Sequence, residues 1–399
     1  MRAVMVKGAS AYDGTRLFID EAAAAFQRAG HTVEIVDLTV EPDHWAALER
    51  AGAGGGDLVF SINFLGESRR ADGRTAAQVV GAPHVVWHVD YVLSQEPRLK
   101  ATPRETAMLL VDHSQVDALN SVMGQDRYAH VGFCPHAAVG PAAPDDPDAD
   151  AFQARRDIPI LLSCTLTRPG PAPWAGLGAR IRAVFDDAFD LAMAADWMRP
   201  LDALDQAMRA RGMTVETLGL TQGRLAAAAL DSQIRLTRRF AFVRALAKTG
   251  LPVHIRGRGW ERDLYRFGKA AAFGGEATMA EVAGLMARSR IVLNTNGNFG
   301  EGSHERPLSA LLAGACVFTD ESRFYAEAFG QDEGLVSFRW SGLDDAMAQL
   351  AALHADPARA HALARAGQKR VMAEHLWDHR VPVILDAARA AADRWRAAA

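Results

Sequence analysis

Cysteine is scarce in this sequence. The 399-residue chain has three cysteines, Cys134, Cys164 and Cys316, and no two of them are spaced as C-x-x-C. An odd number without this spacing argues against a disulfide framework and against a cysteine-rich zinc site. We therefore expect a cytoplasmic protein, in a compartment that keeps thiols reduced.

Long hydrophobic runs and long basic runs are also missing. No apolar run approaches the roughly 20 residues of a membrane span, and the first ten residues predict a strand rather than a signal peptide. The net charge is −4, and Lys and Arg form no long blocks. This distribution argues against a nucleic-acid partner. We expect no transmembrane segment, although peripheral contact with a membrane is compatible with the composition.

Short apolar runs alternate with helical patterns through the first part of the chain. The runs that predict strands are 2–6, 31–38, 57–64, 83–90, 106–112 and 128–134. Strands of this kind, separated by helices of roughly 10–15 residues, indicate a parallel sheet with right-handed crossovers. A Pro- and Asp-rich segment at 140–152 follows and is typical of a linker.

A second alternating series follows this linker. Its predicted strands are 158–166, 251–260, 290–296 and 315–320, and its closing helices are 342–353, 357–372 and 381–398. The helical stretch 177–249 is too long for one crossover, so we expect a helical insertion there. The whole pattern predicts an α/β protein with two Rossmann-like, doubly wound domains, 1–150 and 151–380. We expect a C-terminal helix at 381–399 to pack back on the first domain.

A glycine-rich, charged loop follows the predicted strand 290–296. Its glycines let the backbone approach a ligand closely, and it leads into a short helix with Pro307 in the first turn and Gly314 at the end. A helix N-terminus offers free N–H groups and positive dipole charge. The guanidinium group of Arg306 adds paired N–H donors whose geometry matches phosphate oxygens. The loop therefore predicts a phosphate or diphosphate site; the alternative is a surface loop with incidental charges.

The stretch "IRGRGWERD" (255–263) is a weaker element of the same type. A predicted strand runs into Gly257 and Gly259, with Arg256 and Arg258 interleaved. Glycines allow close backbone approach to a phosphate, but a plain tight turn explains them equally well. Trp260 offers a ring for stacking on a base, although a tryptophan here is more often part of a core.

These segments together resemble a known family. "RGRGWE" (256–261), "RIVLNTN" (290–296), "GSHERPLSALLAGACVFTDES" (302–322) and "HLWDHRV" (375–381) occur in this order. In order and spacing they resemble the C-terminal half of glycosyltransferase group 1 proteins. The branch that the chain resembles most is the bacterial spore-maturation (CgeB-like) one.

The resemblance implies the GT-B fold, in which two Rossmann-like domains face a central cleft and the C-terminal one binds most of a nucleotide sugar. It implies a glycosyltransferase that moves a sugar from this donor to a glycan, a lipid-linked or a protein acceptor. The nucleotide sugar is a substrate, so no cofactor is expected. No D-x-D with acidic flanks marks a metal site, so we expect no metal; cationic side chains and helix dipoles must then stabilise the leaving diphosphate.

The donor-binding residues that the resemblance implies lie in the loops 256–260 and 294–309. The second loop contributes Asn294, Glu301, Gly302, Ser303, His304, Glu305, Arg306 and Ser309. Related enzymes often carry Glu-x7-Glu, whose second Glu holds the ribose; here the first is Glu301 and the second position is Ser309. Glu305 lies one helical turn before Ser309 on the same face, so it is a candidate for the ribose contact.

An inverting transfer also requires a general base. His88 and Asp90 end the predicted strand 83–90 and point to the same side if the backbone is extended, so one of them can orient the other. The alternative is a core histidine and an aspartate that caps a helix. Asp112 with His113 at the next strand end, and His136 nearer the linker, are further candidates with the same structural alternatives.

Two other functions stay open on the sequence. A GT-B epimerase would hydrolyse or isomerise a UDP-sugar without an acceptor. A non-catalytic GT-B scaffold would bind a glycan or a protein partner, and the missing second Glu of the motif leaves room for it. Nucleotide binding by the purified protein would separate the scaffold from the two enzymes.

Overall fold

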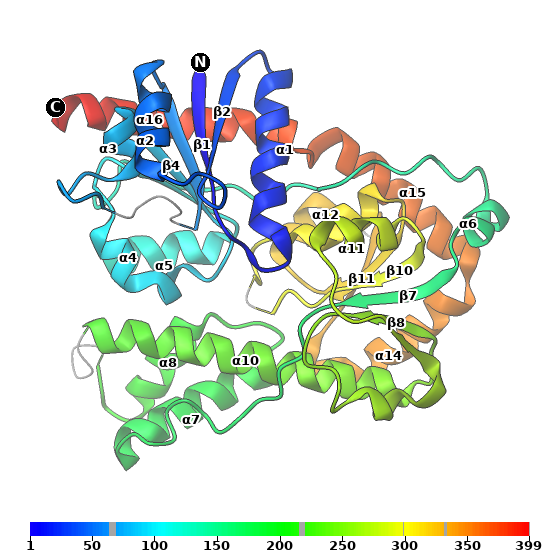
Figure 1. Ribbon diagram of the computed structural model, residues 1–399. Helices are drawn as coiled ribbons and strands as arrows, with labels where there is room; N and C mark the ends of the chain where they lie inside the picture. The colour runs from blue at the N-terminus through cyan, green and yellow to red at the C-terminus, as the bar shows by residue number, and fades with distance from the viewer. Residues whose placement is uncertain (64–68, 215–219, 298, 331–332, 399) are drawn as a thin grey trace. The chain divides into compact units, whose positions relative to one another are not determined.

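The computed structural model describes residues 1–63, 69–214, 220–297, 299–330 and 333–398. The chain forms two compact units (Figure 1), one of Met1–Val139 with Glu374–Ala399 and one of Gly140–Ala373. We describe each unit by itself. Position 64 of the third predicted strand, 215–219 of the helical stretch and 298 of the charged loop lie outside the described residues.

The first unit is built on six parallel strands in the order β2-β1-β3-β4-β5-β6. They are β1 (Arg2–Lys7), β2 (Thr32–Asp37), β3 (Leu58–Ile62), β4 (His84–His88), β5 (Ala107–Leu110) and β6 (His130–Phe133). Every one lies within or beside a predicted apolar run. Strands β3, β4 and β5 are buried along their whole length, as expected of parallel strands covered on both faces.

Helices from both ends of the chain cover this sheet. They are α1 (Gly14–Arg28), α2 (His44–Ala53), α3 (Ala76–Val80), α4 (Glu96–Ala101), α5 (His113–Met123) and α16 (Val381–Ala398). Val4 and Val6 of β1 share a buried cluster with residues of α2 and α3, while α1 packs against β1 and β2. The last helix, α16, packs against β4, β5 and β6, so the C-terminal segment completes the first unit.

The second unit also contains six parallel strands, in the order β12-β11-β10-β7-β8-β9. They are β7 (Ile158–Ser163), β8 (Val253–Arg256), β9 (Ala271–Phe273), β10 (Ser289–Leu293), β11 (Cys316–Asp320) and β12 (Leu335–Phe338). The sequence patterns did not predict β9 and β12. These are edge strands of 3 and 4 residues, too short for an apolar period to show.

The helices of the second unit fall into two groups. Around the sheet lie α6 (Ala149–Arg155), α11 (Met279–Met286), α12 (Glu305–Leu312), α13 (Arg323–Ala328), α14 (Leu343–Ala355) and α15 (Pro357–Glu374), and the second group is α7 (Ala179–Ala194), α8 (Pro200–Ala210) and α10 (Leu220–Lys248). Figure 1 shows α7, α8 and α10 side by side, and they share a core of their own that includes Val184, Leu204 and Leu230.

The long helix α10 belongs to two cores. Its 29 residues span about 43 Å at 1.5 Å per residue. Leu230 and Ile234 pack with α7 and α8, whereas Phe242, Val243 and Leu246 pack under the sheet. The predicted insertion therefore consists of α7, α8 and the first half of α10, and the second half is the crossover from β7 to β8. The middle of α10 lies where the two cores meet.

Candidate functional site

The order of the second sheet reverses between β7 and β10. From β7 the chain continues to β8 and β9 on one side, and from β10 it continues to β11 and β12 on the other. The loops after two such neighbouring strands diverge, and ligands of doubly wound proteins bind at this topological switch point. The loops here begin at Cys164 and Asn294, and the second is the charged loop that the sequence singles out.

A buried polar network fixes the first residues of the charged loop. The Asn294 side chain, fully buried, donates through Nδ2 to Asn296 Oδ1 and Thr319 Oγ1, both at 3.0 Å. The backbone N–H groups of Asn296 and Gly297 donate to the carboxylate of Asp320 at 2.6 and 3.4 Å. Burial raises the pKa of Asp320, although these donors favour its charged form. The loop is therefore anchored to the end of β11.

Arg306 faces this network from the first turn of α12. His304 caps the helix by accepting the Arg306 N–H at Nδ1, 3.3 Å away. The Arg306 guanidinium donates through one Nη to Asn294 Oδ1 at 2.7 Å. Within the described residues no salt bridge joins it to a carboxylate, so the alternative that Arg306 pairs with Glu301 or Glu305 finds no support in the geometry.

Arg239 joins the two strand ends across the switch point. From α10 it donates through Nε to Thr295 Oγ1 and through an Nη to the Thr165 carbonyl, both at 3.3 Å. Burial lowers the pKa of Arg239, and the neighbouring charges of Arg235 and Arg306 lower it further. Arg239 is thus close enough to Arg235 and to Arg306 to be repelled by each, and the nearby Asp320 carboxylate partly offsets this repulsion.

Arg235 lies one helical turn before Arg239, and its aliphatic stem packs on Gly297. A Cβ at Gly297 would lie 2.8 Å from Arg235 Cγ, so this glycine makes room for the arginine. The buried Nε of Arg235 has no hydrogen-bond partner among the described residues. Sequence reasoning missed both α10 arginines, although their i, i+4 spacing placed them on one helix face.

The two glycines of the 256–260 loop allow two backbone segments of the protein to pack closely against each other. Gly257 and Gly259 have φ of 126° and 79°, and a Cβ on either would lie 2.1 Å from the carbonyl oxygen of Cys164 or Leu166. Only glycine tolerates this approach, which brings the segment after β8 against the segment after β7. The role of these two residues in donor binding stays a prediction, because the backbone contact alone explains them.

Trp260 lies in the core, so the expectation that its ring stacks on a base is corrected. Its side chain is fully buried in the core of the second unit, near Phe267, and its indole N–H donates to the Cys164 carbonyl at 2.8 Å. In this conformation the ring offers no face to a nucleotide base. The two arginines beside it are engaged as well: Arg256 donates to the Gly274 carbonyl, and Arg258 pairs with Glu276 at 2.7 Å.

The remaining predicted donor residues follow one another into α12. Ser303, Glu305 and Ser309 are buried, whereas Glu301 and His304 are half-buried. The Gly302 carbonyl accepts the Ser322 hydroxyl at 2.8 Å, which ties the loop to the segment after β11. Glu305 and Ser309 lie one turn apart in α12, as expected, and the ribose contact stays a prediction.

The two candidate bases differ sharply in environment. His88, at the end of β4, is fully buried, and burial lowers its pKa to about 3, so it is a weak proton acceptor. Asp90 is exposed. Its carboxylate accepts Asn63 Nδ2 at 2.7 Å, while Asn63 Oδ1 accepts the Val89 N–H at 2.9 Å. Asn63, with a φ of 51°, therefore positions Asp90, a role that the sequence did not suggest.

The other histidine and aspartate candidates have structural surroundings. Asp112 caps α5, accepting the backbone N–H of Ser114 at 2.8 Å. His113 stacks on Phe133 with ring centroids 3.8 Å apart. His136 is buried against Trp87 with centroids 5.3 Å apart. These surroundings favour the structural alternative for all three.

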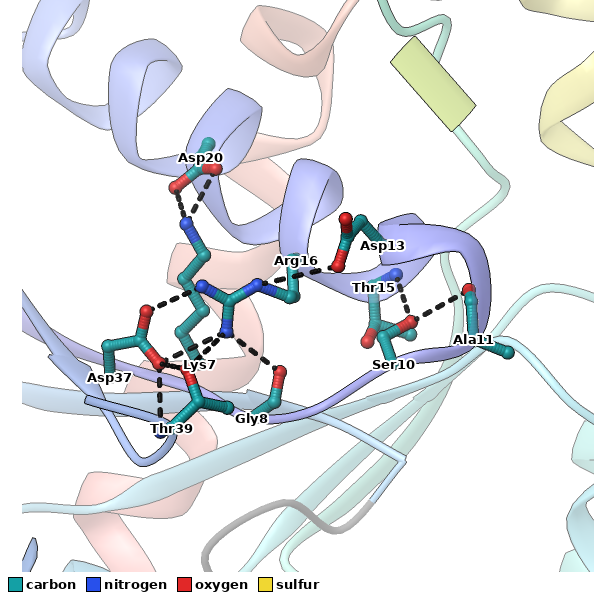
Figure 2. Close-up of polar contacts among 10 residues, drawn as sticks. All are labelled: Lys7, Gly8, Ser10, Ala11, Asp13, Thr15, Arg16, Asp20, Asp37 and Thr39. Atoms are coloured by element: carbon teal, nitrogen blue, oxygen red, sulfur yellow. Dashed lines mark hydrogen bonds and ion pairs between the residues drawn. The ribbon is translucent and has the colours of Figure 1, made fainter. Parts of the chain in front are cut away.

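The first sheet has a switch point of its own, between β1 and β3. Beside it, at the ends of β1 and of its other neighbour β2, Figure 2 shows that the cations are matched by carboxylates. Lys7 Nζ donates to both oxygens of Asp20 at 2.6 and 2.7 Å, and Arg16 donates to both oxygens of Asp37 at 3.0 and 2.6 Å. The Arg16 guanidinium holds the pKa of Asp37 well below its ordinary range.

In residues 1–63, 69–214, 220–297, 299–330 and 333–398, no three His, Cys, Asp or Glu side chains gather as metal ligands would. Over the same part of the chain, no helix combines the length and the apolar character that crossing a bilayer requires.

Known proteins resemble this chain in sequence and in fold. Residues 238–386 match a family model described as "Glycosyl transferase-like", and no curated protein matches the sequence. Sucrose-phosphate synthase from Thermosynechococcus elongatus superposes with a TM-score of 0.56 at 12% identity, over 100% of both chains. Residues 238–386 thus match a glycosyl transferase-like family, and the chain has the GT-B fold.

Two further solved structures share the fold. An alpha-glucosyltransferase in complex with UDP and a mismatched DNA has a TM-score of 0.51 at 12% identity, over 96% of this chain and 100% of its own. HepE from Anabaena, in complex with UDP and glucose, has a TM-score of 0.50 at 12% identity, over 98% of both chains. The predicted two-domain α/β fold and the resemblance to group 1 glycosyltransferases are confirmed. The CgeB-like branch and the individual site residues stay predictions.

Proposed function

We propose that this glycosyltransferase uses a nucleoside-diphosphate sugar and that Arg306, Arg239 and Arg235 hold the diphosphate. The observation that carries the proposal is the convergence of three guanidinium groups at the β7/β10 switch point, with no carboxylate bridging them among the described residues. Gathering like charges in a partly buried place is unfavourable. A bound dianion removes that repulsion and accepts charge-assisted hydrogen bonds.

The same arrangement suits the chemistry of transfer. As the bond from the anomeric carbon to the diphosphate breaks, negative charge grows on the leaving phosphate. Fixed cations stabilise that charge more than they stabilise the bound donor, which lowers the barrier. The N-terminus of α12 adds N–H groups and positive dipole charge on the same side. This supports a reaction that needs no metal ion, and we propose that none takes part.

On the acceptor side we assign the general base to Asp90 rather than His88. The acceptor hydroxyl attacks the anomeric carbon, its proton passes to the Asp90 carboxylate, and the nucleoside diphosphate leaves. Asp90 is exposed and held by Asn63, whereas burial makes His88 a poor acceptor of the proton. The acceptor is a hydroxyl of a glycan, a lipid-linked glycan or a protein.

The experiment compares phosphate-dependent and phosphate-independent binding. Wild type and Arg306→Ala are titrated with UDP, GDP, CDP, CMP and dTDP, and with the nucleoside of the best ligand, in the presence of EDTA. A charge-assisted contact is worth about 1.5–3 kcal/mol, so the variant should bind the diphosphate roughly ten- to a hundredfold more weakly. The nucleoside should bind nearly as before. Arg209→Ala, which removes an exposed arginine paired with Asp205 on α8, is the control.

Each contrary result has a definite meaning. Equal losses for nucleoside and diphosphate would show that Arg306 supports the loop and does not clamp phosphate. If the wild type bound no nucleotide of the panel, the non-catalytic scaffold would replace the proposal. Isomerisation or hydrolysis of the sugar nucleotide without any acceptor would favour the epimerase. Loss of diphosphate binding in EDTA would contradict metal independence.

A further inference from the structure

A recess lies at the ends of β11 and β12, in the unit that also contains the cluster of Arg235, Arg239 and Arg306. It encloses about 400 Å³, within the range of about 300–1,000 Å³ that small-ligand sites occupy. Its walls come from the link between α7 and α8, from Gly300 of the charged loop, and from the segments after the two strands. None of the three clustered arginines lines it.

Charge in this recess is balanced. Arg339 pairs with Glu321 at 3.0 Å and Arg323 pairs with Glu327 at 2.7 Å. Asp196 accepts the Ser341 N–H at 2.9 Å, and this bond lowers the pKa of Asp196. Each lining arginine thus has a carboxylate, in contrast to Arg306 and its neighbours. The recess has many polar atoms but little net charge. It therefore suits a neutral polar ligand better than a phosphate.

Two indole rings supply the apolar part of the walls. Trp197 and Trp340 both line the recess and are half-buried. A pyranose ring has an apolar face of C–H groups, which packs on an indole, and an edge of hydroxyl groups, which pair with carboxylates and guanidinium groups. Amphipathic aromatic rings beside a few placed polar groups are what such a ligand requires.

Trp197 contacts the backbone of the charged loop, and Trp340 hydrogen-bonds to the carboxylate that anchors that loop. A Cβ at Gly300 would lie 2.0 Å from the Trp197 ring, so the loop backbone lies directly on that indole. Trp340 Nε1 donates to Asp320 Oδ2 at 3.0 Å, and the same carboxylate anchors the start of the loop through Asn296 and Gly297. The recess and the arginine cluster therefore share one anchored segment.

We propose that this recess binds one pyranose unit of a neutral saccharide. It is a second site, beside the loop that carries Arg306 but separate from the diphosphate clamp. Its argument rests on the two indoles and the balanced charges and does not depend on the clamp. The pyranose has two possible sources: a unit of the acceptor glycan, or the sugar of the donor.

The test uses defined glycosides. Methyl glycosides of glucose, mannose, galactose, N-acetylglucosamine and rhamnose, and their short oligosaccharides, are titrated by saturation-transfer NMR and tryptophan fluorescence. Wild type is compared with Trp197→Ala, Trp197→Phe and the control Trp45→Ala, which removes a half-buried tryptophan of the other unit. Trp197→Ala should weaken the best glycoside by at least about tenfold, and Trp197→Phe should recover part of the affinity.

The nucleoside diphosphate serves as the second readout. Its affinity should stay unchanged in Trp197→Ala, whereas Arg306→Ala should show the reverse pattern; loss of both ligands in Trp197→Phe, which keeps a ring against the Gly300 backbone, would contradict two separate sites. If a glycoside and a sugar nucleotide bind together, the site takes the acceptor; if they compete while the diphosphate alone does not, it takes the donor sugar. No glycoside binding, or equal binding by wild type and Trp197→Ala, overturns the proposal.

Discussion

Both sheets of the molecule contain six parallel strands, but the cations at the strand ends near their switch points have opposite surroundings. After β1 and β2, Lys7 and Arg16 each donate to both oxygens of an aspartate (Figure 2). After β7 and β10, Arg306 and Arg239 donate instead to neutral oxygens of Asn294, Thr295 and Thr165. The first arrangement pairs each cation with a carboxylate, whereas the second holds its guanidinium groups by neutral oxygens, as the proposed diphosphate site requires.

This difference shows why a count of arginines at strand ends says little about function. A guanidinium that is already paired with a carboxylate gains little from a phosphate, because binding must first break the existing pair. A guanidinium held by amide and hydroxyl oxygens keeps its full charge and has donors to spare. The neighbours of each cation therefore separate a structural arginine from one that binds an anion.

The largest effect should follow from removing two members of the cluster. In the double variant Arg239→Met/Arg306→Met, each lost charge-assisted contact to the diphosphate is worth about 1.5–3 kcal/mol. Diphosphate affinity should therefore fall by roughly a hundred- to ten-thousandfold. Isothermal titration calorimetry with the diphosphate and with its nucleoside measures this loss of affinity. The nucleoside should bind as in wild type. Arg16→Met, which disturbs the paired switch point, is the matched control and should leave diphosphate affinity unchanged. A comparable loss in Arg16→Met would remove the distinction between the two switch points.

The next effect concerns turnover. A general base typically contributes about 10²–10⁴-fold, so Asp90→Asn should lower kcat by at least about a hundredfold while diphosphate affinity stays the same. Asn63→Ala should lower kcat less, because the carboxylate remains but loses the donor that positions it. Release of nucleoside diphosphate from the sugar nucleotide measures both variants. Wild-type turnover in Asp90→Asn would place the base elsewhere or indicate a retaining reaction.

Much of the fold was predictable because its strands are buried apolar runs. Strands β1, β4 and β11 agree with the predicted ranges to within two residues at each end. The helix after the charged loop, with Pro307 in its first turn and Gly314 past its end, was also predictable, since these signals are local chemistry. Edge strands β9 and β12 were not, because their pairing depends on neighbours that are distant in sequence.

The site was predictable only where one segment carries it. Arg306 follows a glycine-rich loop, so its role could be inferred from adjacent residues. Arg239 approaches that loop only because α10 passes from one core to the other and brings residues some 55 positions away beside Thr295. Trp260 shows the opposite error: its position beside two arginines suggested a ligand contact, while tertiary packing buried it. Local sequence cannot show which face of a segment the rest of the fold covers.

The smallest effect concerns the paired switch point and its pH dependence. Arg16 holds the pKa of Asp37 below the ordinary value of 3.8. A depressed pKa in the folded state stabilises the protein above the unfolded value, and that stabilisation is lost as pH falls below about 4. Asp37→Asn should therefore lower stability at neutral pH by about 1–3 kcal/mol and flatten its acid-side slope, as denaturant titrations between pH 3 and 7 would measure. Arg306→Met should leave that slope as in wild type, because within the described residues Arg306 forms no salt bridge with a carboxylate. If Arg306→Met flattened the slope as much as Asp37→Asn, Arg306 would be paired with a carboxylate in solution, and the two switch points would no longer differ.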